Sequence, residues 1–368
     1  MIDSNLRFEV GYFCLMKIIA LITALLFSQL VFATQVILII PDEKGPVFWN
    51  LVHQVSAASA KSLDVQLEVI YGGKNRFSTL EIIEGIVARP IKPDYLIFRP
   101  FYGNAASVFD RVEAKGILFV TLEQAFSGKE ALELQRPKQK YKTWIGEVAY
   151  DNANGGVLLL NALLKEHRIR HPAVKPSIIG MGGDFDSLSI SRQQVLTNLD
   201  SSDDVGLNQI FPTYWDPKNI TVNFEMMLER YPHTNIFWCA GDQLALATLE
   251  QYQQLVNKPT VVGGFDWLPD ALLKIQQGKL TASVGGHFLM GAIAISKIVD
   301  YQHGIDRFSA QPRFYDFEVI TKDNVDSYLN FMQQKKWRKV NFNQFSAYKI
   351  GHKPQPLTMQ NIIELTKE

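Results

Sequence analysis

Short apolar runs alternate with longer amphipathic segments from residue 35 to about residue 334. The runs are rich in Val, Ile and Phe, which is typical of strands, whereas the segments between them have helical spacing. The predicted strands span 35–40, 67–71, 95–98, 117–122, 144–148, 177–181, 206–211, 236–239, 260–262 and 281–284. The clearest predicted helices span 47–63, 79–88, 105–114 and 152–165. This alternation predicts repeated strand–helix–strand units.

The strand runs are almost continuously apolar, as expected when helices cover both faces of a parallel sheet. The chain is therefore predicted to be an α/β protein with doubly wound parallel sheets. A polar stretch at 127–142 separates two series of units, and a length of 368 residues also favours two domains. Ligands of such sheets bind beyond the carboxyl ends of the strands, so the residues that follow each strand are the functional candidates.

The N-terminal segment has the pattern of an export signal. Met16 and Lys17 precede the apolar run 18–32, and Ala33 supplies a small residue for cleavage. We expect translation to start at Met16, so that residues 1–15 lie upstream of the start, and cleavage to follow Ala33. A membrane anchor is the alternative, but the run falls short of the ~20 apolar residues of a spanning helix. The mature protein is therefore expected in the periplasm.

The charge balance argues against nucleic acid as a partner, because Lys plus Arg and Asp plus Glu both number 37. The basic run 335–339 is interpreted as a solvated helix end, with contact to a partner as the alternative. Cys14 and Cys239 are the only cysteines, and Cys14 precedes the predicted cleavage, so no internal disulfide is expected. Cys239 lies in an apolar stretch, which favours a buried and inert thiol.

A search for motifs finds no catalytic, cofactor or metal site. The glycine-rich turn at 180–185 lacks the sixth-position glycine of a dinucleotide fingerprint, and no phosphate loop or nucleophile elbow is present. His167 and His171 have helical spacing for a metal, but no third ligand is near and Pro172 ends the helix. A favourable helix C-terminus is the better interpretation of these histidines. We expect no enzymatic activity, no cofactor and no metal.

Several motifs in a fixed order resemble the type I periplasmic binding proteins, which include ribose and galactose binding proteins and the ligand domains of lactose-repressor relatives. The resemblance spans roughly residues 35–334. The motifs are Phe48-Trp49, the strand 95–98, Asp151-Asn152 with Gly155-Gly156, Arg192, Ala240-Gly241-Asp242 with 245–247, and 262–266 with Pro269-Asp270. The resemblance implies two lobes that are joined by a hinge and close on a small ligand.

The resemblance implies three crossovers between the lobes, near 146–149, 284–286 and 315–318. The N-terminal lobe would then comprise 34–148 with 286–315, and the C-terminal lobe 149–285 with 316–346. Residues 347–368 are left as a polar tail, which contains Pro354 and Pro356. This composition predicts a tail that is partly disordered.

A sugar or polyol has flat apolar faces and a belt of hydroxyl groups, so its site needs aromatic walls and planar charged groups. Phe48 and Trp49 fit the wall, with core packing as the alternative. Arg192 matches the family arginine that donates to adjacent hydroxyl groups, with a surface ion pair as the alternative. These three residues are the first part of the predicted site.

Polar residues at strand ends complete the predicted site. Asp266 follows a strand and matches the family's ligand-binding aspartate. Asp242 follows another strand and opens a helix, so N-capping explains it nearly as well as ligand binding does. Glu123 and Gln124 end the fourth strand, where sugar binders often place a polar pair. A solvated loop is the alternative for these two.

The stretch 314–328 resembles the end of the autoinducer-2 receptor branch of this family. Where that receptor has an arginine and an asparagine against its ligand, this chain has Gly285 and Glu123, which argues against autoinducer-2 itself. Gly241 also replaces an asparagine common in sugar binders, and His287 lies near their hinge glutamine. The ligand is expected to be sugar-like, with a hydrogen-bonding set of its own.

The expected function is that of a periplasmic solute-binding protein, which presents a small sugar-like ligand to an inner-membrane ABC permease. A ligand-sensing partner of a sensor kinase or chemoreceptor is the alternative. An exported α/β enzyme is disfavoured because the chain has neither a nucleophile constellation nor a cofactor motif. A repressor is disfavoured because an export signal, and no helix-turn-helix, precedes the first strand.

Overall fold

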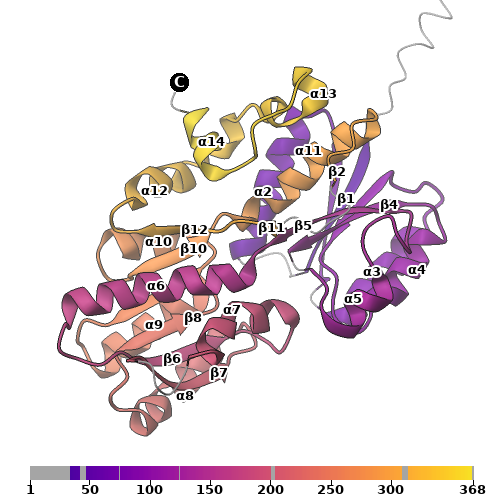
Figure 1. Cartoon of the computed structure of the whole chain (residues 1–368). Coiled ribbons are helices and arrows are strands. Elements are labelled where there is room, and N and C mark those ends of the chain that lie inside the picture. The colour runs from indigo at the N-terminus through magenta and orange to yellow at the C-terminus, as the bar shows by residue number, and fades with distance from the viewer. Residues whose placement is uncertain are drawn as a thin grey trace, which may run out of the picture. The chain divides into compact units, whose positions relative to one another are not determined.

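The computed structural model describes residues 34–41, 47–73, 75–123, 125–199, 204–308 and 314–366. These residues form two six-stranded sheets with helices packed against them (Figure 1). Neighbouring strands are parallel throughout, except that β12 runs antiparallel to β10. The predicted fold, two doubly wound α/β lobes, is confirmed.

We call each sheet with its helices a lobe. The first sheet has the order β11-β5-β4-β3-β1-β2 and the second has the order β12-β10-β9-β8-β6-β7. The strands of the first sheet are β1 (Gln35–Ile40), β2 (Gln66–Tyr71), β3 (Tyr95–Phe98), β4 (Leu118–Glu123), β5 (Trp144–Tyr150) and β11 (Phe314–Tyr315). Those of the second sheet are β6 (Ser177–Gly182), β7 (Gly206–Pro212), β8 (Ile236–Cys239), β9 (Val261–Phe265), β10 (Ala282–Gly285) and β12 (Glu318–Thr321).

Helices α2 (Val47–Ser62), α3 (Arg76–Val87), α4 (Ala105–Glu113), α5 (Gly128–Leu134) and α11 (Met290–Gln302) belong to the first lobe. Helices α6 (Asn152–Arg170), α7 (Ser187–Thr197), α8 (Pro217–Arg230), α9 (Asp242–Leu255) and α10 (Pro269–Gln276) belong to the second lobe. The chain then ends in α12 (Val325–Gln333), α13 (Ala347–Ile350) and α14 (Met359–Glu364).

Strand β1 shows why the apolar runs are continuous. Ile37 and Ile39 pack in one cluster with residues of α3 and α4. Leu38 and Ile40 pack in the larger core, which includes residues of α2. Successive side chains of a strand point to opposite faces, and here both faces are buried. A polar residue in such a strand would be buried, which costs free energy unless the residue is hydrogen-bonded.

The chain passes between the lobes three times. β5 ends at Tyr150 in the first sheet, and β11 and β12 are consecutive strands in different sheets. Between β10 and α11, Gly286 has a φ of +100°, which favours glycine. Ala149 and Tyr150, which the sequence analysis placed in the second lobe, pair with β11 in the first sheet. The other predicted lobe limits stay predictions.

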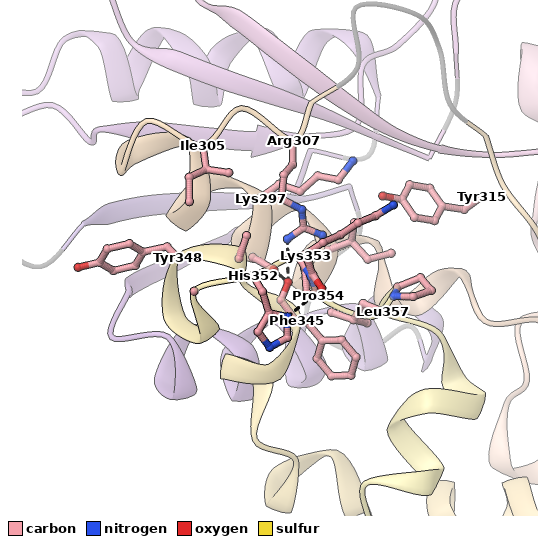
Figure 2. A pocket seen from close by; sticks show the side chains of 15 residues that line it. Lys297, Ile305, Arg307, Tyr315, Phe345, Tyr348, His352, Lys353, Pro354 and Leu357 are labelled. Atoms are coloured by element: carbon pink, nitrogen blue, oxygen red, sulfur yellow. Dashed lines mark hydrogen bonds between the residues drawn. The ribbon is translucent and has the colours of Figure 1, made fainter.

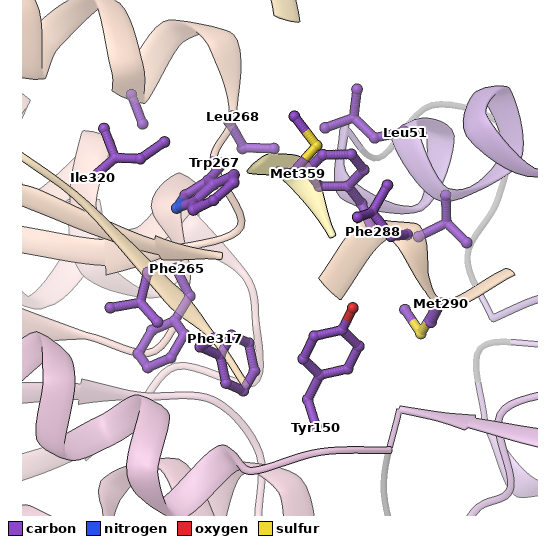
Figure 3. Close-up of a cluster of buried hydrophobic side chains, with 14 of the residues drawn as sticks. Leu51, Tyr150, Phe265, Trp267, Leu268, Phe288, Met290, Phe317, Ile320 and Met359 are labelled. Atoms are coloured by element: carbon purple, nitrogen blue, oxygen red, sulfur yellow. The ribbon is translucent and has the colours of Figure 1, made fainter. Parts of the chain in front are cut away.

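Buried aromatic side chains gather where the chain crosses between the lobes (Figure 3). The rings of Tyr150 and Phe317 lie 5.1 Å apart, and Tyr150 Oη donates to the carbonyl oxygen of Gly286 at 3.3 Å. Phe288 and Met359 belong to the same buried core. Tyr150, Gly286 and Phe317 are therefore buried, whereas Asp316 of the third crossover is exposed.

The described residues of the C-terminal tail, 347–366, are folded, which corrects the prediction that the tail is partly disordered. α12 packs on α10 in the second lobe, whereas α13 packs on α11 in the first lobe. Leu357, Met359 and Ile362 are all buried. This packing could not be predicted from the sequence, because the apolar residues of the tail are few and are separated by polar ones. We call residues 325–366 the C-terminal segment.

Two further differences from the sequence analysis are local. Helix α5 lies within the predicted polar stretch, and its weak apolar pattern has one buried residue, Leu134. His167 is fully buried near the end of α6, and burial lowers its pKa, so packing and not a charge at the helix end explains it.

Within the described part of the chain, every helix is too short or too polar to cross a membrane. The predicted export signal, with Met16 and Cys14, lies outside the described residues.

Candidate ligand-binding site

A cavity of about 260 Å³ opens where the carboxyl ends of both sheets face each other. Its volume is close to the lower end of the range for small-molecule sites, roughly 300–1,000 Å³. Both lobes contribute to its wall, which is lined by Pro41, Phe48, Trp49, Arg99, Glu123, Leu188, Arg192, Trp215, Gly241, Gln243, Leu244 and Asp266. We call it the cleft cavity.

The strand order explains why these residues meet. In the first sheet the strand order changes direction between β1 and β3. The chain segments that follow these two strands therefore run to opposite faces of the sheet, and a crevice lies between them. Phe48 lies after β1 and Arg99 lies after β3. The second sheet reverses beside β6, where Arg192 on α7 and Gly241 after β8 flank the equivalent crevice. The two crevices share one cavity.

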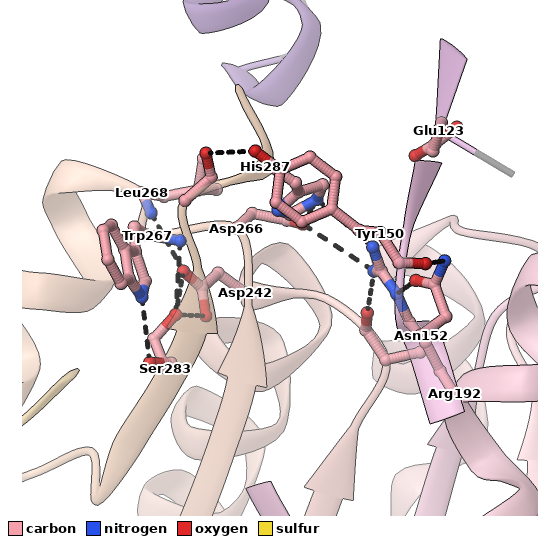
Figure 4. Close-up of polar contacts among 12 residues, drawn as sticks. Glu123, Tyr150, Asn152, Arg192, Asp242, Asp266, Trp267, Leu268, Ser283 and His287 are labelled. Carbon is pink, nitrogen blue, oxygen red and sulfur yellow. Dashed lines mark hydrogen bonds and ion pairs between the residues drawn. The ribbon is translucent and has the colours of Figure 1, made fainter. Parts of the chain in front are cut away.

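The side chain of Arg192 is only 2% exposed, and hydrogen bonds hold it in one orientation (Figure 4). Its Nε donates to Asn152 Oδ1 at 2.9 Å and its Nη1 donates to the carbonyl oxygen of Ala240 at 2.9 Å. Its guanidinium also lies 4.5 Å from the centroid of the Phe265 ring. With Nη2 beside His287, at least two of the five N–H donors stay available to a ligand.

Asp266 and His287 complete the polar group around Arg192. Asp266 Oδ1 lies 3.8 Å from Arg192 Nη1 and 3.3 Å from His287 Nε2. Burial lowers the pKa of His287 to about 4, partly opposed by Asp266. The ring is therefore neutral near pH 7, and its Nε2 can accept from Arg192 or donate to Asp266 according to its tautomer.

The backbone is strained at three residues of the cavity wall. Glu123, Trp215 and Asp266 have φ values of +75°, +60° and +108°. Residues other than glycine rarely adopt this region, and such strain is concentrated at functional sites. The strain turns these side chains toward the space between the lobes.

Arg99 links the two lobes across the cavity. Its Nε lies 2.7 Å from Glu123 Oε2, and its Nη2 pairs with the carboxylate of Asp186, which caps the first turn of α7. Glu123 is buried, and burial raises its pKa whereas the charges of Arg99 and Arg192 lower it. The alternative of a solvated loop at Glu123 is therefore excluded.

Aromatic rings form the apolar part of the wall. Phe48 stacks on His287 at 4.3 Å between centroids and meets Trp49 edge to face at 5.4 Å. Trp215 lies against Gly183, where a Cβ would come within 2.2 Å of its ring. Gly183 is therefore required for the position of Trp215.

Asp242 does not line the cavity. It is fully buried, and its carboxylate accepts from Ser283 Oγ at 2.8 Å and from the Leu268 N–H at 2.9 Å. Gly241 is the N-cap of α9, so N-capping by Asp242 is not observed either. Asp242 instead fixes the loop that carries Asp266, and burial raises its pKa well above the ordinary value.

The model of the periplasmic binding protein domain matches residues 36–304 of the chain. The chain belongs to this family. Members of the family are periplasmic and bind substrates. A comparison with curated proteins gives no significant match.

Solved structures of periplasmic binding proteins share this fold. A periplasmic sugar-binding protein from Pseudomonas fluorescens has a TM-score of 0.75 at 22% identity, over 86% of this chain and 94% of that one. An ABC transporter solute-binding protein from Actinobacillus succinogenes with bound D-allose has 0.68 at 20% identity, over 80% and 99%. A Caulobacter myo-inositol binding protein bound to myo-inositol has 0.65 at 19% identity, over 82% and 97%.

Within this periplasmic binding protein, five of the predicted residues lie together in the cleft cavity, namely Phe48, Trp49, Glu123, Arg192 and Asp266. Asp242 lies behind them, and Gln124 lies outside the described residues. Their contact with a ligand stays a prediction.

The sequence analysis missed Arg99 and Trp215. Arg99 directly follows a predicted strand and Trp215 closely follows another, so the rule that function lies beyond strand ends could have found both.

Proposed function

We propose that this protein binds a small neutral sugar or polyol between its lobes and presents it to an inner-membrane ABC permease, without transforming it. The observation that carries the proposal is the cleft cavity, where a buried and fixed arginine lies among aromatic rings contributed by both lobes.

The charge of the wall favours a neutral ligand. Two cationic side chains, Arg99 and Arg192, line the cavity together with two carboxylates, Glu123 and Asp266. Sugar hydroxyl groups donate and accept hydrogen bonds, so they can satisfy both kinds of group at once. The rings of Phe48 and Trp215 offer flat surfaces to the apolar faces of a sugar.

The structural relatives support this ligand class, because two of the three described above hold D-allose and myo-inositol. The proposed periplasmic location rests on the family and on the predicted export signal. A sensor kinase or chemoreceptor as the partner stays a prediction, since no observation favours it over a permease.

Closure of the lobes would convert binding into a signal for the permease. The ion pair between Arg99 and Asp186 joins the lobes beside the cavity, so it is made only when they lie close together. A ligand that contacts Arg192 and Phe48 at the same time would favour this closed arrangement, because it binds that arrangement more tightly.

The test is a thermal-shift screen of monosaccharides and polyols, followed by calorimetry with the best ligand. Trp215→Ala should weaken binding at least tenfold, because it removes a ring from the wall. Tyr214→Ala is the matched control, since Tyr214 is 57% exposed and does not line the cavity. Failure of every sugar and polyol to bind, or equal affinity for both variants, would contradict the proposal.

A further inference from the structure

A further cavity, of about 400 Å³, lies in the first lobe between α5 and β5. Residues of α5, of the loop 135–139 and of β5 form its wall, and none of the described residues lines both this cavity and the cleft cavity. Its volume falls within the range of roughly 300–1,000 Å³ that is typical of small-molecule sites. We call it the α5-side cavity.

Glu147 places a carboxyl group in this wall, on a strand that is otherwise buried. β5 lies inside the first sheet, between β4 and β11, and every other residue of the strand is buried. Glu147 Oε1 is inaccessible to solvent and, within the described part of the chain, it has no hydrogen-bond partner. A buried polar atom without a partner costs free energy. The fold therefore leaves an acceptor to which a ligand can donate.

Arg136 brings a positive charge to the same cavity. Burial raises the pKa of Glu147 to about 7, and the charge of Arg136 opposes this rise. Among the described residues, these two side chains do not form a direct ion pair, although both line the cavity. The α5-side cavity thus offers a carboxyl group and a guanidinium that are not occupied by each other.

The loop of the wall is strained and is fixed by hydrogen bonds. Gln135, which lines the cavity, has a φ of +62°, and Lys138 has a φ of +67°. Residues other than glycine rarely adopt this region, and such strain is concentrated at functional sites. Gln139 Oε1 accepts from the Arg136 N–H at 3.2 Å, and the Lys138 N–H donates to the carbonyl oxygen of Trp144 at 2.9 Å. The loop is therefore held against β5 before any ligand binds.

The remaining wall is largely apolar. The rings of Phe126 and Trp144 meet edge to face at 5.8 Å between centroids. The indole N–H of Trp144 already donates to Thr121 Oγ1 at 3.2 Å, so it asks for no further partner. Leu132 of α5 lines the same cavity and is 81% exposed. A ligand with an apolar body would remove part of this side chain from water, which is favourable.

These features together select the chemistry of the ligand. A simple amine could pair with Glu147 but would leave Arg136 without an acceptor. A simple carboxylic acid could pair with Arg136 but would leave Glu147 without a donor. A sugar would leave Leu132 uncovered. An α-amino acid carries an ammonium group, a carboxylate and a side chain on one carbon atom, so it can satisfy all three parts of the wall.

We propose that the α5-side cavity is a second ligand site, which binds a free α-amino acid with an apolar side chain. The ammonium group donates to Glu147, the carboxylate accepts from Arg136, and the side chain packs on Leu132. The proposal does not depend on the ligand of the cleft cavity.

Calorimetry on the full purified protein tests the site with L-phenylalanine and L-leucine. We expect one site per chain. Phenylalaninamide, which lacks the carboxylate, and N-acetyl-L-phenylalanine, which lacks the ammonium group, should each bind at least tenfold more weakly than L-phenylalanine. Binding of either amino acid with this preference supports the site. Failure of both at millimolar concentration, or equal affinity for either analogue, overturns it.

Variants locate the bound amino acid. Glu147→Gln and Arg136→Gln should each weaken binding at least tenfold, because each removes one charged partner. Glu133→Gln is the matched control, since Glu133 is an exposed carboxylate of α5 that does not line the cavity. If Glu147→Gln does not fold, Arg136→Gln carries the test at a half-buried position. Unchanged affinity in the charge variants would place the amino acid elsewhere, including the cleft cavity, and would overturn the proposal.

Proton release gives a second readout that is specific to Glu147. A bound ammonium group favours the ionised carboxylate and so lowers the pKa of Glu147 from about 7. Binding at pH 7 should therefore release up to about half a proton per chain, which appears as a difference in binding enthalpy between phosphate and Tris buffers. Glu147→Gln should abolish this difference. Proton release that persists in this variant would contradict the contact between the ammonium group and Glu147.

Discussion

Two cavities of this protein differ in volume and in how their walls are organised. In the cleft cavity, two arginines face two carboxylates, and each charged group already contacts another. A larger cavity, of about 820 Å³, is lined by residues of α11 and of the C-terminal segment (Figure 2), and we call it the hinge-side cavity because Tyr315 of the third crossover lines it. The arrangement in the cleft cavity favours a neutral ligand with many hydroxyl groups.

The comparison also shows that the cavity with the larger volume is not the one with the more preorganised wall. The hinge-side cavity is the larger of the two, yet backbone strain and a buried, fully oriented arginine occur in the smaller one. Strain and buried charge both cost free energy, so a fold retains them where they serve a function. The cleft cavity is therefore the stronger candidate for the main ligand.

The largest expected effect is that of Arg192→Ala. It removes hydrogen bonds to Asn152 and Ala240 and leaves Asp266 without its buried cation. The free energy of unfolding should therefore fall by about 3–5 kcal/mol. Urea denaturation measures this loss, and calorimetry should show sugar affinity reduced at least a hundredfold.

Arg192→Lys is the milder companion variant, because it keeps the charge but not the planar fork. It should weaken sugar binding at least tenfold, as measured by calorimetry. An unchanged sugar affinity would contradict the proposed role of the planar fork.

The next effect is expected from Met359→Ala in the C-terminal segment. Met359 is 1% exposed, and truncation of such a side chain costs about 2–5 kcal/mol. Urea denaturation measures this loss. Met226→Ala, at a methionine that is 55% exposed, should change the unfolding free energy by less than about 0.5 kcal/mol.

The smallest expected effect is a pH dependence that originates at His287. An unfolded histidine binds a proton near pH 6.5, whereas burial holds the pKa of His287 at about 4. The unfolded state therefore gains protons first as the pH falls, and native stability should drop by about 2 kcal/mol between pH 7.5 and pH 5.

His287→Gln should flatten this part of the stability curve, which thermal melts across the pH range will measure. His352→Gln is the matched control substitution at an exposed position. A wild-type curve without any slope between pH 7.5 and pH 5 would contradict the assignment to His287.

Much of the cleft site could be predicted from the sequence because parallel sheets place the carboxyl ends of their strands at one edge. Phe48 and Asp266 each follow a predicted strand, Arg192 was predicted from its match to the family arginine, and all three line the cavity. Asp242 follows the same rule but points into the protein, where Ser283 and Leu268 occupy its carboxylate. Position after a strand therefore identifies candidates, while the side-chain direction is set by partners that are distant in the sequence.

The C-terminal segment shows the limit of composition as a guide. The polar residues and prolines of its last part, 347–368, predicted partial disorder, yet Asp300, far away in the sequence, supplies the carboxylate that holds Ser346 and Tyr348 on α11. No local pattern indicates such a contact, because the partner is separated from Ser346 by 46 residues.

The sequence by itself determined the two lobes, because buried parallel strands require continuous apolar runs and the runs recur at regular intervals. It also determined which residues stand at the strand ends. Only the tertiary structure decided that Arg99 and Trp215 join the cleft cavity, that Asp242 lies behind it, and that the C-terminal segment lines the hinge-side cavity. These outcomes depend on contacts between segments far apart in the chain, which periodicity and composition do not encode.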